Sequence, residues 1–156
     1  MPSSLRSPDN FNQPLDRVAI PACLEMLTFG IQFNQRLNGN LTCNMSLEGV
    51  SLPSDLRSLT LGPTFNHCLD RVIWPSGLLD LRLGDGSNQS LRCVQLPSSL
   101  QCLQFGEASS QGLEYVNLLS NLQSLSLPES FGYNLESVVL PSSLQKLVLH
   151  GVVVSC

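Results

Sequence analysis

A 22-residue period runs through the chain and constrains its fold more than any other feature. The same slot of the period falls at Pro53, Pro75 and Pro97, and then at Leu119 and Pro141. The unit reads P-S-x-L-x-x-L-x-[LF]-G-x-x-F-N-x-x-L-x-x-V-x-L and contains two hexads of the form L-x-x-[LV]-x-[LF]. Six copies of the two hexads supply 36 positions, and all 36 are apolar. A fixed period of this length is typical of a solenoid, whose stacked coils bury a continuous core.

The hexads predict strands rather than helices. Proline or glycine recurs within every ten residues or so, which leaves no room for a helix of useful length. Turns at Pro-Ser and at glycine would then join two short strands in each coil. The expected fold is an all-β solenoid of about six 22-residue coils, with two strands per coil in parallel sheets and little or no helix.

The chain is expected to form one domain, residues 1–156, that begins with an irregular coil. In this first coil, residues 1–20, Pro2 and Pro21 lie closer together along the chain than the period requires. The segment RSPDN stands where the apolar end of the first hexad belongs. The coil is therefore expected to be short.

Two further irregularities follow from the register. Residues 33–42 and 43–52 repeat the second half of one coil, which adds a ten-residue duplication to the period. Polar residues take two apolar slots of the first copy, so residues 38–42 are predicted to loop out as a bulge. The last coil, residues 141–156, is incomplete.

A column of phenylalanines is expected at one corner of the coil. Serine replaces phenylalanine in two consecutive coils, at Ser87 and Ser109. The loss of two neighbouring rings predicts a notch or a local collapse near residues 85–112. The phenylalanines of the column are Phe11, Phe33, Phe65 and Phe131.

The L-x-x-V-x-L segment resembles the strand of leucine-rich repeats. The run FNQPLDRVAIPACLEMLTFGIQFNQ, residues 11–35, resembles more closely the FNIP repeat, a 22-residue relative with F-N, P-S-S-L and F-G marks. The chain is also similar to the bacterial-surface type of leucine-rich repeat. The resemblance implies a curved, leucine-rich-repeat-like solenoid whose L-x-x-V-x-L-P sheet lies on the concave side. It implies a binding scaffold whose partners contact the variable surface positions.

An asparagine column follows the phenylalanines. A short amide at a turn can bond the backbone groups that the turn leaves unpaired, and this structural role is favoured. Glycosylation is the alternative, because Asn40, Asn44 and Asn88 stand in N-x-S/T sequons. The column consists of Asn12, Asn34, Asn44, Asn66 and Asn88.

The net charge and the hydropathy of the chain disfavour two classes of protein, nucleic-acid binders and membrane-spanning proteins. A net charge of -4 disfavours a nucleic-acid binder, which would carry a basic patch. No apolar run has the ~18 residues of a membrane span, and no signal peptide is visible, so a cytoplasmic location is expected.

The cysteines and histidines, which could take part in catalysis or bind a metal, are scattered along the sequence. The six cysteines form no C-x-x-C motif and are expected to be free thiols, with metal or redox roles as the alternative. His67 and His150 stand in no catalytic motif. The chain is therefore expected to be no enzyme, with neither cofactor nor metal.

A partner-binding face is predicted on the outward slots of the second hexad. One slot is acidic in five of six coils, and the next contains arginines and a tyrosine, which are common at interfaces. The outward slots of the first hexad, with Gln101, Gln123 and Gln145, are more neutral. A solvated edge of alternating charge is the competing explanation. The predicted face comprises Asp16, Arg17, Glu48, Asp70, Arg71, Arg92, Glu114, Tyr115 and Glu136.

The end of the sequence suggests a second surface. The incomplete last coil offers an open strand edge and apolar side chains with no charged cap. Association there, with another copy or with a partner chain, is predicted to involve Leu144, Leu147, Val148, Leu149, Val152, Val153 and Val154.

Two functions remain open at this point. The first is a protein-interaction scaffold that binds through the L-x-x-V-x-L sheet face. The alternative is a small structural subunit of a larger assembly, or a fragment of a longer array, held through its uncapped ends.

Overall fold

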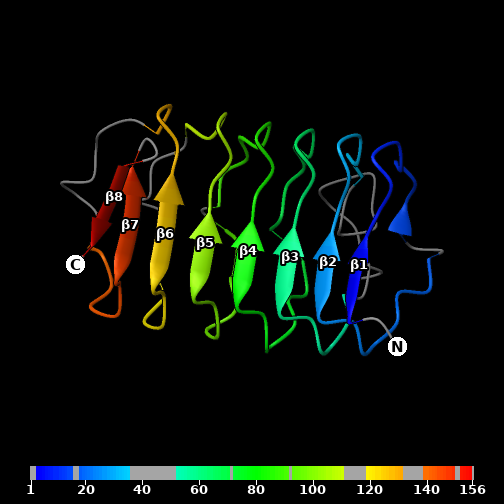
Figure 1. Ribbon diagram of the computed structural model, residues 1–156, viewed down its shortest axis with the longest axis horizontal. Helices are drawn as coiled ribbons and strands as arrows, with labels where there is room; N and C mark the ends of the chain where they lie inside the picture. The colour runs from blue at the N-terminus through cyan, green and yellow to red at the C-terminus, as the bar shows by residue number, and fades with distance from the viewer. Residues whose placement is uncertain are drawn as a thin grey trace.

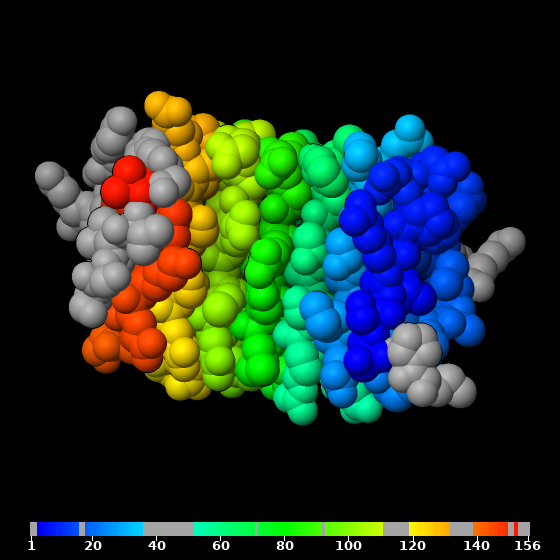
Figure 2. Space-filling model, viewed as in Figure 1, coloured from blue at the N-terminus to red at the C-terminus, as the bar shows by residue number. Residues whose placement is uncertain are grey.

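The computed structural model describes residues 3–15, 18–35, 52–70, 72–91, 93–110, 119–131, 139–149 and 152–155. These residues form an all-β solenoid with one sheet of eight strands in chain order and no helical element (Figure 1). Each coil adds one slab to the stack, so the chain colours follow one another along the molecule (Figure 2). The strands are β1 (Ser4–Arg6), β2 (Met26–Thr28), β3 (Ser58–Thr60), β4 (Asp80–Arg82), β5 (Cys102–Gln104), β6 (Ser124–Leu127), β7 (Lys146–Leu149) and β8 (Val152–Ser155).

The first seven strands are parallel and keep one register. Leu5 pairs with Leu27, one period along the chain, and Leu27 pairs with Leu59, one period plus the ten-residue duplication further on. Each remaining step to β7 is again one period. The stack thus has about five regular turns, close to the six expected, and one longer turn that contains the duplication. The bulge predicted at residues 38–42 lies outside the described residues.

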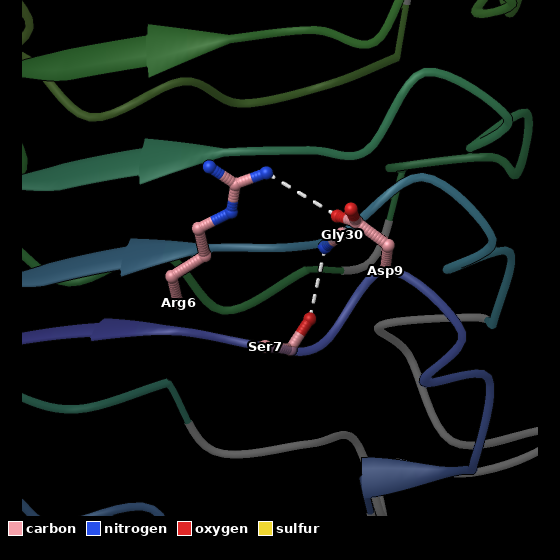
Figure 3. A network of polar contacts seen from close by, with 4 residues as sticks. All are labelled: Arg6, Ser7, Asp9 and Gly30. Carbon is pink, nitrogen blue, oxygen red and sulfur yellow. Dashed lines mark hydrogen bonds and ion pairs between the residues drawn. The ribbon is translucent and has the colours of Figure 1, made fainter.

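The first coil is not short, contrary to the prediction. Because Leu5 pairs with Leu27, β1 lies a full period before β2, and the Pro-Ser at positions 2 and 3 is out of register with the later copies. Ser7 therefore takes the slot of Phe29. Its buried hydroxyl accepts a hydrogen bond from the Gly30 N–H at 2.9 Å, while Arg6 pairs with Asp9 at 3.2 Å (Figure 3).

A bulge at the start of each strand from β2 to β7 explains the unusual spacing of the first hexad. The N–H groups of Glu25 and Met26 both donate to the Ser3 carbonyl, at 2.8 Å each, and the next coils repeat this pattern. Two residues facing one partner residue make a β-bulge. Both intervening residues of L-x-x-L then face outward, while Leu24 and Leu27 remain buried.

The second hexad forms a turn in the described residues, so the prediction of two strands per coil is wrong there. The Val72 N–H donates to the Leu69 carbonyl at 3.2 Å, and Leu15–Val18 and Leu91–Val94 make the same bond. Such an i to i+3 bond closes a four-residue turn. The bond uses a backbone N–H and a carbonyl that would otherwise be available to pair with a strand of the neighbouring coil. In the described residues each coil from β1 to β7 therefore contributes one strand from its first hexad to the sheet.

The phenylalanine corner packs without the predicted notch. Phe33 stacks between Phe11 and Phe65, with ring centroids 6.0 and 6.2 Å away. Ser87 and Ser109 are as buried as these rings, and the Ser109 hydroxyl donates to the Ser87 carbonyl at 2.7 Å. The turn itself does not change, because Ser87 N–H bonds the Gly84 carbonyl as Phe65 N–H bonds that of Gly62. Hydrogen bonding replaces ring packing, and the prediction of a dent is wrong.

Candidate interaction surface

Three side chains per coil point outward from the sheet, at the x positions of the first hexad L-x-x-L-x-L. Neighbouring strands are ~4.8 Å apart, so equivalent side chains form columns along the stack. The face is mixed in character: Met26 is an exposed apolar residue, Arg82 and Asp80 form an ion pair at 3.3 Å, and Gln104 is neutral and exposed. In the part of the chain that the structure describes, the hydroxyl and amide side chains of β2 to β6 on this face make no hydrogen bond within the protein.

Some polar side chains at the corners are used differently, because they bond one coil to the next. The Ser99, Ser143 and Thr64 hydroxyls donate to carbonyls of the preceding coil at 2.6 to 2.8 Å. Such groups have less capacity left for a partner. The hydroxyl and amide side chains of β2 to β6 are not used in this way.

The asparagine column is a ladder, as predicted, although it lies at the surface rather than in a buried turn. Each side-chain oxygen accepts the backbone N–H one coil further on, at 3.0 to 3.1 Å. The bonds run from Asn34 to Asn12, Asn66 to Asn34, Asn88 to Asn66 and Ser110 to Asn88. Of the three sequons, Asn88 thus has a structural role, and Asn40 and Asn44 lie outside the described residues.

The partner-binding face predicted from the sequence is largely untested. Asp70 is exposed and lies in the Leu69–Val72 turn rather than on a strand. A second sheet, on which the face was placed, does not form in the described residues. The other members, Asp16, Arg17, Glu48, Arg71, Arg92, Glu114, Tyr115 and Glu136, lie outside them.

The predicted end surface has a different shape from the one expected. The chain folds back after β7, and β8 pairs with it in antiparallel fashion, Leu149 opposite Val152 and Leu147 opposite Val154. Leu144 and Leu147 are only 7% and 8% exposed, so this end of the core is covered. Val148 and Leu149 are half-buried, and Val152 is exposed. Association at this end stays a prediction, which now rests on the β8 edge, Val153 included.

His67 packs against the neighbouring coil and against Phe65. The His67 ring nitrogen Nε2 lies 2.8 Å from the Asn34 carbonyl oxygen, and the ring meets Phe65 edge-on. No three His, Cys, Asp or Glu side chains among the described residues come together as a metal site. The same residues include no helix that could cross a membrane.

The four cysteines in the described ranges form no disulfide, and Cys102 lies on the sheet face. Burial and then the neighbouring Asp80 raise the pKa of the Cys102 thiol, and Arg82 and Lys146 offset part of this. A raised pKa lowers the thiolate fraction, and the thiolate is the reactive form.

Cys102 is therefore expected to react with a maleimide more slowly than the exposed Cys23 and Cys93 near pH ~8, below the ordinary thiol pKa of ~8.5. Timed labelling followed by peptide mass mapping measures the three rates. The Asp80→Asn variant should accelerate labelling at Cys102 and leave Cys23 unchanged. Equal rates at all three thiols would contradict this prediction.

The comparisons with known proteins agree with the repeat geometry. The family model described as FNIP Repeat matches residues 44–86, a segment that contains β3 and β4. Residues 44–86 are thus a segment of FNIP-type repeats. The comparison with curated proteins found no match.

A solved structure extends the likeness to most of the chain. It is CroV588, described as a novel circular LRR protein structure, with 28% identity and a TM-score of 0.56. The match covers 90% of this chain and 26% of CroV588, so the chain spans about a quarter of that protein. The expected resemblance to FNIP and leucine-rich repeats is confirmed.

Sequence reasoning passed over the first hexad because its outward slots were neutral. One signal in the sequence distinguishes the hexads. Glycine follows the first hexad in most coils, whereas proline, which cannot donate to a ladder, follows the second. Strand pairing is thus favoured for the first hexad.

Proposed function

We propose that this FNIP-repeat chain is a non-enzymatic scaffold that binds a protein partner across the outward face of β2 to β6. Repeat proteins of this kind commonly mediate protein interactions, through extended surfaces created by stacking. The observation that carries the proposal is the contrast between the two kinds of polar side chain in the described residues. At the corners, Thr64, Ser99 and Ser143 bond the neighbouring coil, whereas the hydroxyl and amide side chains of β2 to β6 have no partner within the protein.

The proposal differs from the sequence-based one in the face it assigns. Side chains on a regular sheet are held at fixed spacing, which lowers the entropy lost on binding. The mixture of an apolar residue, an ion pair and neutral amides suits a protein surface of similar mixed polarity. It does not single out a strongly charged partner.

Matched surface variants test the assignment. One carries Arg82→Glu and Gln104→Glu on the sheet, and the other carries Asp70→Lys and Glu114→Lys on the second hexad. Partners captured by the parent chain would be identified by mass spectrometry, and their affinity for each purified variant would be measured. We expect the sheet variant to lose at least ~10-fold in affinity while the second variant is unaffected. The reverse result would assign binding to the second hexad, and no loss in either variant would refute both faces.

A further inference from the structure

The outward side chains of β2 to β7 recur at a spacing that matches an α-helix laid along the stack. Consecutive strands are ~4.8 Å apart, so equivalent outward side chains recur at that distance (Figure 1). On one side of an α-helix, side chains recur about every 3.5 residues, which is ~5.3 Å at a rise of 1.5 Å per residue. On one side of an extended segment they recur every two residues, ~6.6 Å apart. From β2 to β7 a helix therefore drifts by about half a strand spacing, whereas an extended segment drifts by about two.

The width and length of the face also fit one helix. The strands β2 to β5 have three residues each, and β6 and β7 have four. At ~3.3 Å per residue they are ~10–13 Å long, and a helix with its side chains is ~10–12 Å across. In the other direction the strands extend over ~24 Å, the length of about 16 helical residues. The projected area of roughly 300 Å² is below the ~800 Å² that each partner gives to a standard interface, which favours one narrow element over a broad surface.

The side chains of the face allow a helix to approach. The middle outward column carries short side chains at Ser58, Cys102 and Ser124, and all three are half-buried. The neighbouring column carries the longer amides of Gln101 and Gln123, which can hydrogen-bond polar side chains beside them. The face offers side chains and no free strand edge, so a partner segment must satisfy its own backbone. A helix bonds its N–H and C=O groups internally, whereas a single extended segment does not.

The charges on the face give the helix a direction. Glu25, just before β2, and Lys146, at the start of β7, are exposed, and neither forms an ion pair within the described residues. Between them, Asp80 and Arg82 pair with each other at 3.3 Å, and Arg57 donates to a corner carbonyl at 3.2 Å. An α-helix is positive at its N-terminus and negative at its C-terminus. The N-terminus therefore fits over β2 and the C-terminus over β7.

We infer that the partner contacts this face with a single α-helix of about four to five turns, laid along the stack with its N-terminus over β2 and its C-terminus over β7. The inference rests on the proposed function and adds the form of the partner. The helix is polar and uncharged over β5 and β6, to match Gln104, Ser124 and Ser126, and its last turn is acidic, to match Lys146.

Two displayed libraries of peptides of about 18 residues, selected against the 156-residue chain, test the form of the partner. Both are randomised at the same positions, those on one side of a helix, and the second library has two central prolines that prevent a helix. We expect only the helical library to yield binders that lose at least ~10-fold in affinity for the Arg82→Glu, Gln104→Glu variant. Such binders from both libraries at equal affinity, from the proline library alone, or from neither, overturn the inference. The proposed function fails separately, if the captured partners keep their affinity for that variant.

The selected helical peptide then tests the direction. Glu25→Lys and Lys146→Glu should each weaken its binding by at least ~3-fold, because each reverses a charge near one end of the helix. Glu129→Lys is the matched control, since Glu129 is exposed in a turn outside the sheet, and it should leave the binding unchanged. Tighter binding by both sheet variants would place the helix the other way round and overturn the inferred direction. No change in either, or an equal loss with Glu129→Lys, would show that the helix does not lie along the sheet.

Discussion

Replacing Gly84 by alanine is expected to lower the free energy of unfolding by about 3 kcal/mol, because neighbouring coils touch backbone to backbone there. A Cβ at Gly84 would strike the carbonyl oxygen of Gly62 and lie 2.7 Å from its carbonyl carbon. Gly30, Gly62 and Gly106 meet the same obstacle one coil earlier in the stack. Backbone atoms cannot rotate aside, so the substitution must separate coils that the sheet holds together.

The Gly77→Ala variant is the matched control for this substitution. A Cβ at Gly77 would meet only the guanidinium tip of Arg57, at 2.6 Å from one nitrogen. This tip can move away at the cost of one exposed hydrogen bond, Arg57 to the Gly77 carbonyl at 3.2 Å. The change is expected to cost less than ~1 kcal/mol. Urea denaturation of both variants measures the difference, and equal losses would show that coil contact at the glycine column does not limit stability.

Truncating Phe33 to alanine is expected to cost about 3 to 5 kcal/mol, the range for a fully buried aromatic residue. The side chain is 0% exposed and stacks on Phe29, with centroids 3.8 Å apart, as well as on Phe11 and Phe65. Its loss leaves a cavity shared by three coils, which can collapse only if the sheet register shifts.

The Phe11→Ala variant provides the comparison. Phe11 is only partly buried and stacks on Phe33 from the end of the column. It should cost less than half as much as Phe33→Ala in the same urea measurement. If both variants lose the same free energy, or if Phe33→Ala loses less than ~1 kcal/mol, the rings would not act as a stacked column.

Much of the repeat architecture could be predicted because it depends on position along the chain. Leu27, Leu59 and Leu81 are buried and in register at the places that the period assigns to them. The asparagine ladder was predictable for the same reason, since a side chain repeated every coil meets its own copy. The outcome at Ser87 was not, because the missing ring suggested a void and the hydrogen bond to its neighbour depends on the three-dimensional turn.

The candidate surface was less predictable. Both hexads have the same apolar spacing, so that spacing could not distinguish a bulged strand from a turn. The distinction depends on whether N–H groups bond the preceding coil, as at Met26, or their own turn, as at Val72. Which of the two hexads forms the strand then decides which outward-facing residues lie together on the sheet.

The sequence by itself determined the 22-residue coil, its apolar interior and the position of the ten-residue duplication, because burial of regularly spaced leucines allows only a stack. The tertiary structure alone decided which hexad forms the sheet, that Ser7 takes a core slot, and that β8 turns back across β7. These features depend on hydrogen bonds and steric contacts between residues from different coils. Apart from the glycine or proline that follows each hexad, no local pattern of residues contains that information, so these features became visible only in the folded chain.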